Sequence, residues 1–193
     1  MRALVLATCF SCVALAAYAA PKAKAPAPTD APKEVVVSSA LPTSALFFST
    51  CAESMGSEDN FNKQMDALAK SKVAVKMSPD QLKGMVNDKE AQNAWGVKGF
   101  ADPKKVLLLT YNKADNICGM HASDVGPEDI RHAFQADLKK FIDQHNGKVK
   151  VFKPEKKDDL TAYGAEVQMS DKTLQFGIAI SEKTGEAFLT THL

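Results

Sequence analysis

Two alternating segments near the end of the chain constrain the fold more than any other feature of the sequence. In residues 163–169 and again in residues 174–180, apolar side chains stand at every second position. A period of two places such side chains on one face of a strand, and the polar pair Asp171-Lys172 between the segments is typical of a tight turn. The sequence therefore predicts an antiparallel hairpin with one apolar face.

A long amphipathic helix is expected to lie across a face of the sheet. Its start is indicated by Gly126-Pro127 followed by two acidic residues, and its end by Asn146-Gly147. The apolar stripe consists of Ile130, Ala133, Phe134, Leu138, Phe141 and Ile142. Further strands are predicted at residues 106–111, 117–122, 149–152 and 187–193, and a short buried strand or turn at residues 45–51.

Two more helices are predicted before the sheet. Ser57 with two acidic residues after it favours a helix start, and Ser78-Pro79-Asp80-Gln81 has the spacing of a capping box. Residues 95–100 are expected to form a packed connection containing two glycines. The fold class is therefore α+β, with a mostly antiparallel sheet of about five to six strands, one long helix across it and two N-terminal helices. A doubly wound parallel sheet is disfavoured because the strands follow one another in runs.

The first forty residues have a different composition from the rest. Arg2, an uncharged apolar run over residues 3–17 and the small-residue pattern Ala17-Tyr18-Ala19 are typical of a secretory signal peptide cleaved after Ala19. The run is shorter than the ~20 residues of a transmembrane helix. Residues 20–40, rich in Ala, Pro and Lys, predict a disordered spacer. We expect a periplasmic or secreted protein with a single domain over residues 41–193.

No stable membrane anchor is expected. Cys9 and Cys12 lie early in the apolar run and lack the Leu-x-small-Cys context of a lipoprotein signal. The whole chain has 24 basic and 23 acidic residues, so loss of Arg2 with the signal leaves a formally neutral protein. A neutral chain lacks the basic surplus that nucleic-acid binding requires, so nucleic acid is not expected as a partner.

Cys51 and Cys118 are the two cysteines outside the predicted signal. In an oxidising compartment an even pair most simply forms a disulfide, which for a loop of this length contributes about 4 kcal/mol in the chain-entropy model. The alternative is a metal site in which Cys118 and His121, spaced C-x-x-H, are completed by His132 or Cys51. A second metal-binding pair with local spacing is missing from the sequence, so we expect no metal and no cofactor.

Signatures of common enzyme classes are missing from the sequence. His121 is the one histidine that a rigid hairpin is expected to present, with Met120 beside it and Asp124 close in sequence. His145 falls in the last turn of the predicted long helix, where a cap is the simpler role. Met65 and Met85 belong to the two predicted N-terminal helices, where methionine side chains form adaptable binding grooves or fill a core.

The motif Phe47-x-x-Thr50-Cys51, Trp95, the hairpin over residues 108–118 and Phe134 together resemble a family of small exported proteobacterial (lipo)proteins with no established activity. This resemblance covers most of residues 47–190. It implies an envelope location and the disulfide, and it carries no catalytic residues. The missing lipoprotein signal departs from the lipid-anchored members of that family.

Three functions are compatible with these features. The first is a non-enzymatic binding or accessory protein, with an inhibitor, immunity or envelope-assembly role, that meets a protein partner through a sheet edge or the Met65 and Met85 helices. Trp95, midway between the predicted helices and strands, is a further candidate for that interaction surface. The second is a hydrolase-like or metal-dependent enzyme that uses His121 with Asp124. The third is a carrier of an apolar ligand between the helices and the sheet.

Overall fold

The computed structural model describes residues 40–82, 93–98 and 106–193, which form three α-helices and nine strands. The helices are α2 (Ala40–Phe47), α3 (Glu58–Lys70) and α4 (Pro127–Gln144). The strands are β1 (Ala74–Lys76), β2 (Ala94–Lys98), β3 (Val106–Asn112), β4 (Ile117–Ala122), β5 (Lys148–Val151), β6 (Glu155–Lys157), β7 (Leu160–Gln168), β8 (Thr173–Ser181) and β9 (Ala187–His192).

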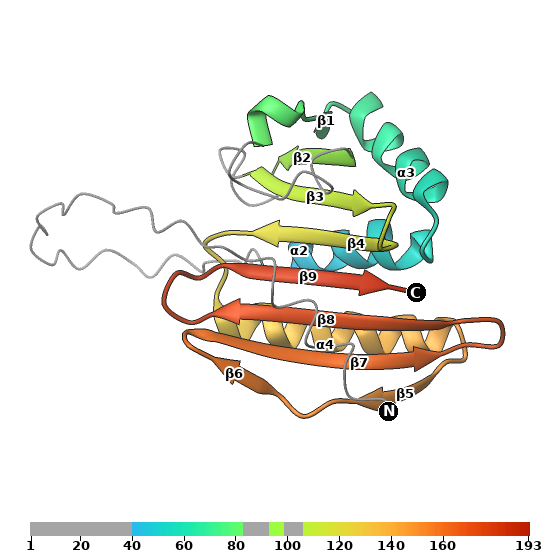
Figure 1. The fold of residues 1–193 in the computed structure, drawn as a ribbon, viewed down its shortest axis with the longest axis vertical. Helices are drawn as coiled ribbons and strands as arrows, with labels where there is room; N and C mark the ends of the chain where they lie inside the picture. The colour runs from blue at the N-terminus through green and yellow to red at the C-terminus, as the bar shows by residue number, and fades with distance from the viewer. Residues whose placement is uncertain (1–39, 83–92, 99–105) are drawn as a thin grey trace, which may run out of the picture.

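All strands belong to one sheet, and every pairing is antiparallel (Figure 1). The order across the sheet is β1-β2-β3-β4-β9-β8-β7-β5, and β6 also pairs with β7. Within the described residues the sheet is built in two halves, because α2 precedes β1 to β4 and α4 precedes β5 to β9, and each half ends in a central strand. The pairing of β4 with β9 therefore joins the two halves.

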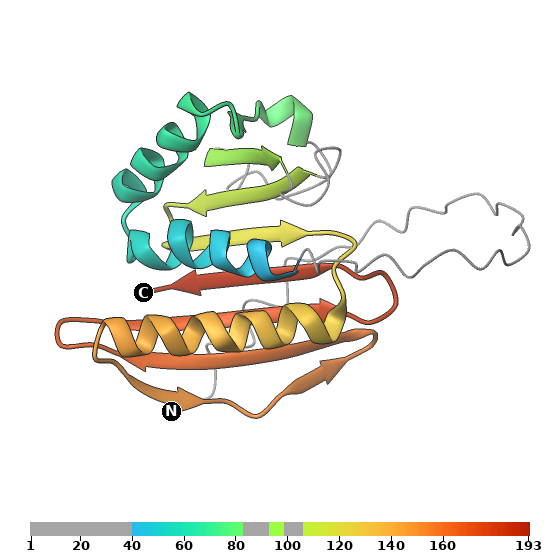
Figure 2. The ribbon, with the colours of Figure 1, turned by 180° about the vertical axis from the view of Figure 1, so that it is seen from behind.

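The helices α2 and α4 lie side by side on the same face of the sheet (Figure 2). The alternation in β8 explains this arrangement, because the residues that face the helices are buried and the intervening ones are only half-buried. The buried residues are Leu174, Phe176, Ile178 and Ile180. The predicted α+β class and the long helix across the sheet are therefore confirmed.

An aromatic cluster fills the space between the helices and the sheet. The ring of Phe48 stacks on Phe176 of β8 with centroids 5.6 Å apart, and it also contacts Phe134 and Phe141 of α4 at 5.5 and 6.1 Å. Phe141 in turn meets Phe176 edge-on at 5.2 Å. Phe48, the first residue after α2, thus connects that helix to both the long helix α4 and the sheet.

The prediction of a strand or turn at residues 45–51 is wrong. The structure has α2 there, followed by a π-helical turn, η2 (Phe48–Ala52). Residues 45–48 are apolar without a clear period, and such a segment becomes a helix when it is buried on most sides. Leu46, Phe47 and Phe48 are all buried, which matches that explanation.

The sheet has nine strands rather than the five to six predicted. The strands that were missed are β1, β2 and β6. β1 and β6 have three residues each, too few for a recognisable alternation, and β6 consists entirely of charged residues. β2 contains Trp95 and Gly96, which were interpreted as part of a connection; the structure pairs them with Leu109 and Leu108 of β3.

Both predicted helix starts have their capping hydrogen bonds in the structure. Ser57 caps α3 by accepting a hydrogen bond from the Asn60 N–H. The capping box at Ser78 is also present, because the Ser78 N–H donates to Oε1 of Gln81 at 2.8 Å and the Gln81 N–H donates back to the Ser78 Oγ at 3.4 Å. It opens a 3-10 turn, η3 (Pro79–Leu82), and the remainder of that predicted helix, with Met85, lies outside the described residues.

Cys51 and Cys118 form the predicted disulfide. Cys51 lies in η2 and Cys118 in β4, so the bond ties the segment after α2 to a central strand across a separation of 67 positions. Both cysteines are almost completely buried, at 0% and 2% exposed. A cross-link between segments so distant in sequence restricts the unfolded chain strongly.

Replacing both cysteines by alanine, Cys51→Ala with Cys118→Ala, is expected to lower the free energy of unfolding by about 2–5 kcal/mol, because the unfolded chain regains its freedom. Urea denaturation without reductant measures the change. Reductant serves as the control, since it should shift the curve of the wild-type protein and leave that of the double variant in place. Equal urea midpoints for the two proteins in the absence of reductant would contradict the expectation.

Candidate functional site

Three of the residues singled out in the sequence are parts of the core. Met65 of α3, Trp95 of β2 and Met120 of β4 are 0%, 5% and 2% exposed and belong to the main apolar cluster. Met65 therefore fills the core beneath α3 and does not line a groove on the surface. The role of these three side chains in the structure is packing.

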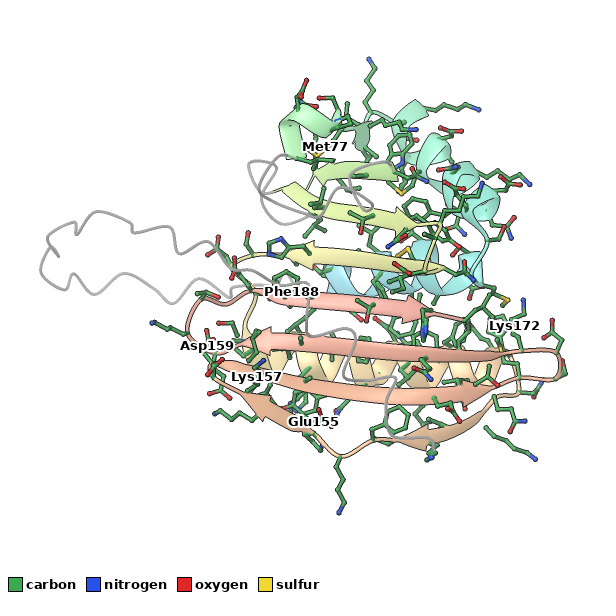
Figure 3. The ribbon with its side chains drawn as sticks, viewed as in Figure 1. Met77, Glu155, Lys157, Asp159, Lys172 and Phe188 are labelled. Carbon is green, nitrogen blue, oxygen red and sulfur yellow. A yellow bond between two sulfur atoms is a disulfide. The ribbon has the colours of Figure 1, made fainter. Side chains whose placement is uncertain are left out.

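His121 lies at the end of β4, on the face of the sheet opposite α2 and α4. Its ring stacks almost parallel on Phe188 of β9, with centroids 4.4 Å apart and an interplanar angle of 9°. Phe188 is its direct cross-strand partner and is labelled in Figure 3. The imidazole Nε2 lies 3.7 Å from Oε1 of Glu186, in the turn between β8 and β9, and makes no hydrogen bond with the described residues.

The charge state of His121 depends on two opposing effects. Burial lowers the pKa of the imidazole below 6.5, and the negative charge of Glu186 opposes this shift. Burial also lowers the pKa of His192, which lies on the same face at the end of β9. The lowered pKa values favour the neutral form of both rings at neutral pH, which makes the His121 ring an uncharged aromatic surface.

Asp124 follows β4 in the loop that leads to α4. Its backbone has φ = 53°, the left-handed conformation, and the next residue, Val125, donates its N–H to the Gly185 carbonyl at 3.0 Å. The loop after β4 and the turn before β9 are thus held together at this end of the sheet. Glu186 in that turn was not singled out from the sequence, because only the β4–β9 pairing brings it to His121.

The face of the sheet that carries His121 and Phe188 has small residues at its centre. Cross-strand pairing joins Gly119 to Thr190, Thr190 to Gly177, and Gly177 to Gly164 across four neighbouring strands. In the next row Phe188 pairs with Ala179, which pairs with Ala162. Apart from that of Phe188 these side chains are short, so the surface over β9, β8 and β7 is nearly flat between the rings of Phe188 and Phe152.

Neighbouring side chains explain part of this glycine content. A Cβ atom at Gly177 would lie 3.0 Å from Oγ1 of Thr190, and one at Gly164 would lie 3.1 Å from the ring of Phe152. Both distances are tighter than ordinary van der Waals contact. Phe152 and Thr190 therefore lean over the glycine backbone, and Phe152 borders the flat surface on the side of β5.

A polar network holds α3 against β2 and was also missed in the sequence. The Asn93 side chain donates to Oε1 of Glu58 at 3.2 Å and to Oδ1 of Asn62 at 3.0 Å, and it accepts the indole N–H of Trp95 at 3.1 Å. Burial, with the charge of Glu58 adding to it, raises the pKa of the Tyr111 hydroxyl to about 12. Each group here has a partner, which makes the network structural.

A hollow of about 460 Å³ lies at the other end of the sheet, where α4 is followed by β5. Its lining comprises His145, Asn146, Lys148, Gln168, Met169 and Ser170. His121 and Asp124 are not among these residues. His145 is the cap of α4, as expected; its Nε2 lies 3.2 Å from Oε1 of Glu53, and its ring contacts Phe141 in a tilted arrangement with centroids 4.4 Å apart. The hollow is therefore separate from the surface around Phe188.

Within residues 40–82, 93–98 and 106–193 no group of three or more His, Cys, Asp or Glu side chains is arranged to hold a metal ion. The alternative metal site that used Cys118 loses its thiolate, because that sulfur is bonded to Cys51. No helix in the described part of the chain is long and apolar enough to span a membrane.

The chain was compared with protein-family models, with curated proteins and with solved structures, and none of these matches it. The candidate surface therefore rests on its own geometry, that is, on the stacked pair His121 and Phe188 beside a flat centre of small residues.

The depressed pKa values of the two histidines predict how stability depends on pH. Below about pH 6.5, His121 and His192 bind protons more readily in the unfolded chain than in the folded protein. The free energy of unfolding should therefore fall as the pH is lowered through this range. The variant His121→Phe keeps a ring against Phe188 without a titrating group. Its unfolding free energy should therefore fall less steeply between neutral and mildly acidic pH.

Urea denaturation at a series of pH values measures this slope for the wild-type protein and the variant. His192→Phe provides a second test, and the two substitutions together should flatten the curve further than either one alone. Superimposable curves for all of these proteins would show that neither ring is protected from protonation by the fold.

Proposed function

We propose that this protein is an exported, non-enzymatic binding protein that meets a protein partner through the face of the sheet opposite α2 and α4. The observation that carries this proposal is the composition of that face. His121 and Phe188 form a stacked aromatic pair beside the small residues of β7, β8 and β9. Aromatic side chains on a surface without charged residues are a feature of the core of a protein interface.

The pattern of burial supports the choice of this face. In the helix-facing rows of β8, side chains are buried by α2, η2 and α4, while Gln175, Gly177 and Ala179 on the other face remain half-buried. Among the described elements, only η3 covers part of that second face, where Leu82 packs with Ala94 and Leu108 over β2 and β3. No helix in the described part of the chain covers the surface over β9, β8 and β7, which is the contact area of this proposal.

Export is the second part of the proposal. Its support is the signal-like pattern at the start of the sequence together with a disulfide between two buried cysteines, a combination that fits an oxidising compartment. A partner in the same compartment, in an inhibitor, immunity or envelope-assembly role, is the class of interaction that this location favours.

The structure provides no specific observation in favour of the two alternatives, the enzyme that uses His121 and the carrier of an apolar ligand. The Nε2 atom of His121 is buried and stands beyond hydrogen-bond distance of Glu186, and the hollow at the end of α4 is lined by other residues. A nucleophile or base that acts on a substrate needs an approachable atom in a concave site. The interior between the helices and the sheet is filled by the Phe48 cluster, which leaves the carrier hypothesis without support of its own.

A pair of matched arginine substitutions tests the surface. Ala179→Arg places a long charged side chain at the centre of the flat face, where its cross-strand neighbours are Ala162 and Phe188. Gln135→Arg places the same side chain on the exposed surface of α4. We expect Ala179→Arg to weaken partner binding at least tenfold and Gln135→Arg to leave it unchanged.

Site-directed cross-linking from residue 179 in the envelope identifies the partner. The affinity of each arginine variant for that partner is then measured. Thermal unfolding controls for stability, because both variants should retain a cooperative transition close to that of the wild-type protein. If the two arginine variants bind equally well, the proposed face is not the interface. If residue 179 yields no cross-linked species at all, the binding function itself loses its basis.

A further inference from the structure

We propose that Asn146 is a site of spontaneous deamidation, controlled by local opening of the C-terminal end of α4. Asn146-Gly147 is the only Asn-Gly pair in the sequence. The structure places it at an exposed corner between α4 and β5, on the rim of the hollow that also includes His145 and Lys148. This site is unrelated to the proposed binding face.

The chemistry needs only water and the chain itself. The backbone nitrogen of Gly147 loses its proton to hydroxide and attacks the side-chain Cγ of Asn146, forming a new C–N bond. The Cγ–Nδ2 bond then breaks, and the amide nitrogen takes a proton from water and leaves as ammonia. Water opens the resulting five-membered imide at either carbonyl, which gives aspartate or isoaspartate at position 146. Because Gly147 has no side chain, its nitrogen approaches Cγ without steric hindrance.

The folded turn restrains this reaction. The Gly147 N–H donates to the Ile142 carbonyl at 2.9 Å, and the His145 N–H donates to the Phe141 carbonyl at 3.1 Å. Asn146 itself has φ = 52°, the left-handed conformation that ends many helices. Attack on Cγ requires the Gly147 nitrogen to be released from this bond. The last turn of a helix opens more readily than its centre, and α4 has no basic residue in its last turn to stabilise the carbonyl groups there.

Other asparagines in the described part of the chain are less suited to the reaction. Each is followed by a residue with a side chain, which hinders the attacking nitrogen. Those asparagines are Asn60, Asn62, Asn93, Asn112 and Asn116. Asn93 and Asn112 are also buried and hold their side chains in hydrogen bonds. Position 146 should therefore react first.

The product changes the end of α4. A carboxylate at position 146 adds negative charge next to the negative end of the helix dipole, which is unfavourable. Isoaspartate in addition lengthens the backbone by one carbon within the turn that carries the Gly147 to Ile142 hydrogen bond. Either product therefore weakens the junction of α4 with β5, beside the pair His145 and Glu53.

The test is incubation of the folded, disulfide-bonded protein at mildly alkaline pH, followed by peptide mapping with mass spectrometry. We expect the peptide that contains residue 146 to exchange an amide for a carboxylate several-fold faster than peptides that contain Asn60 or Asn112, with isoaspartate in excess over aspartate. The same protein unfolded in urea should react faster still, because the Gly147 N–H is then free.

Two variants complete the experiment. Asn146→Gln should abolish the fast phase, since the longer side chain forms the corresponding ring much more slowly. Asn146→Asp imitates one product and should lower the thermal midpoint of the protein. If the peptide with residue 146 stays unmodified in the folded protein while the urea-unfolded sample converts, the closed turn protects Asn146 and the proposal fails. It fails equally if Asn60 or Asn112 reacts first.

Discussion

The contact of Phe48 with Phe134, Phe141 and Phe176 is the interaction on which the rest of the structure depends. A sheet of nine antiparallel strands has to bury one face, and α4 alone covers only part of that face. Phe48 brings α2 beside α4 and places both helices over the central strands. The disulfide of Cys51, three residues further along, then fixes the same segment to β4.

This one-sided arrangement determines what the other face is able to do. With both long apolar rows of β8 and β9 directed to the helices, the second face retains short side chains and the stacked pair His121 and Phe188. The two faces are therefore physically different, since one is a packed aromatic interior and the other is a flat surface without charge at its centre. The proposed binding role of the second face is based on that difference.

The parts of the fold with a strong period were predictable from sequence. The hairpin of β7 and β8, the helix α4 and its end at Asn146-Gly147 were recognised because apolar residues recur there over many positions. The short strands β1 and β6 lack that length, and α2 lacks a clear apolar period, although it packs beside α4 on the sheet. Local pattern carries no information about such tertiary burial.

The candidate surface was predictable only in part. His121 was identified from its place on a hairpin, but its partners Phe188 and Glu186 come from the other half of the chain. They meet His121 because β4 and β9 pair at the centre of the sheet, and a single sequence does not reveal which distant strands pair. Met65 and Met120 were candidates for an interaction surface, but both are core residues. Their burial depends on which distant elements pack together, and a single sequence does not reveal this.

The central role of the Phe48 cluster is tested most directly by comparing Phe48→Ala with Phe188→Ala in urea denaturation of the oxidised protein. If the Phe48 cluster organises the fold, Phe48→Ala should lower the free energy of unfolding by about 3–5 kcal/mol. Phe188→Ala, on the opposite face, should lower it by about 1 kcal/mol or less. Equal losses for the two variants, or the larger loss for Phe188→Ala, would contradict the account.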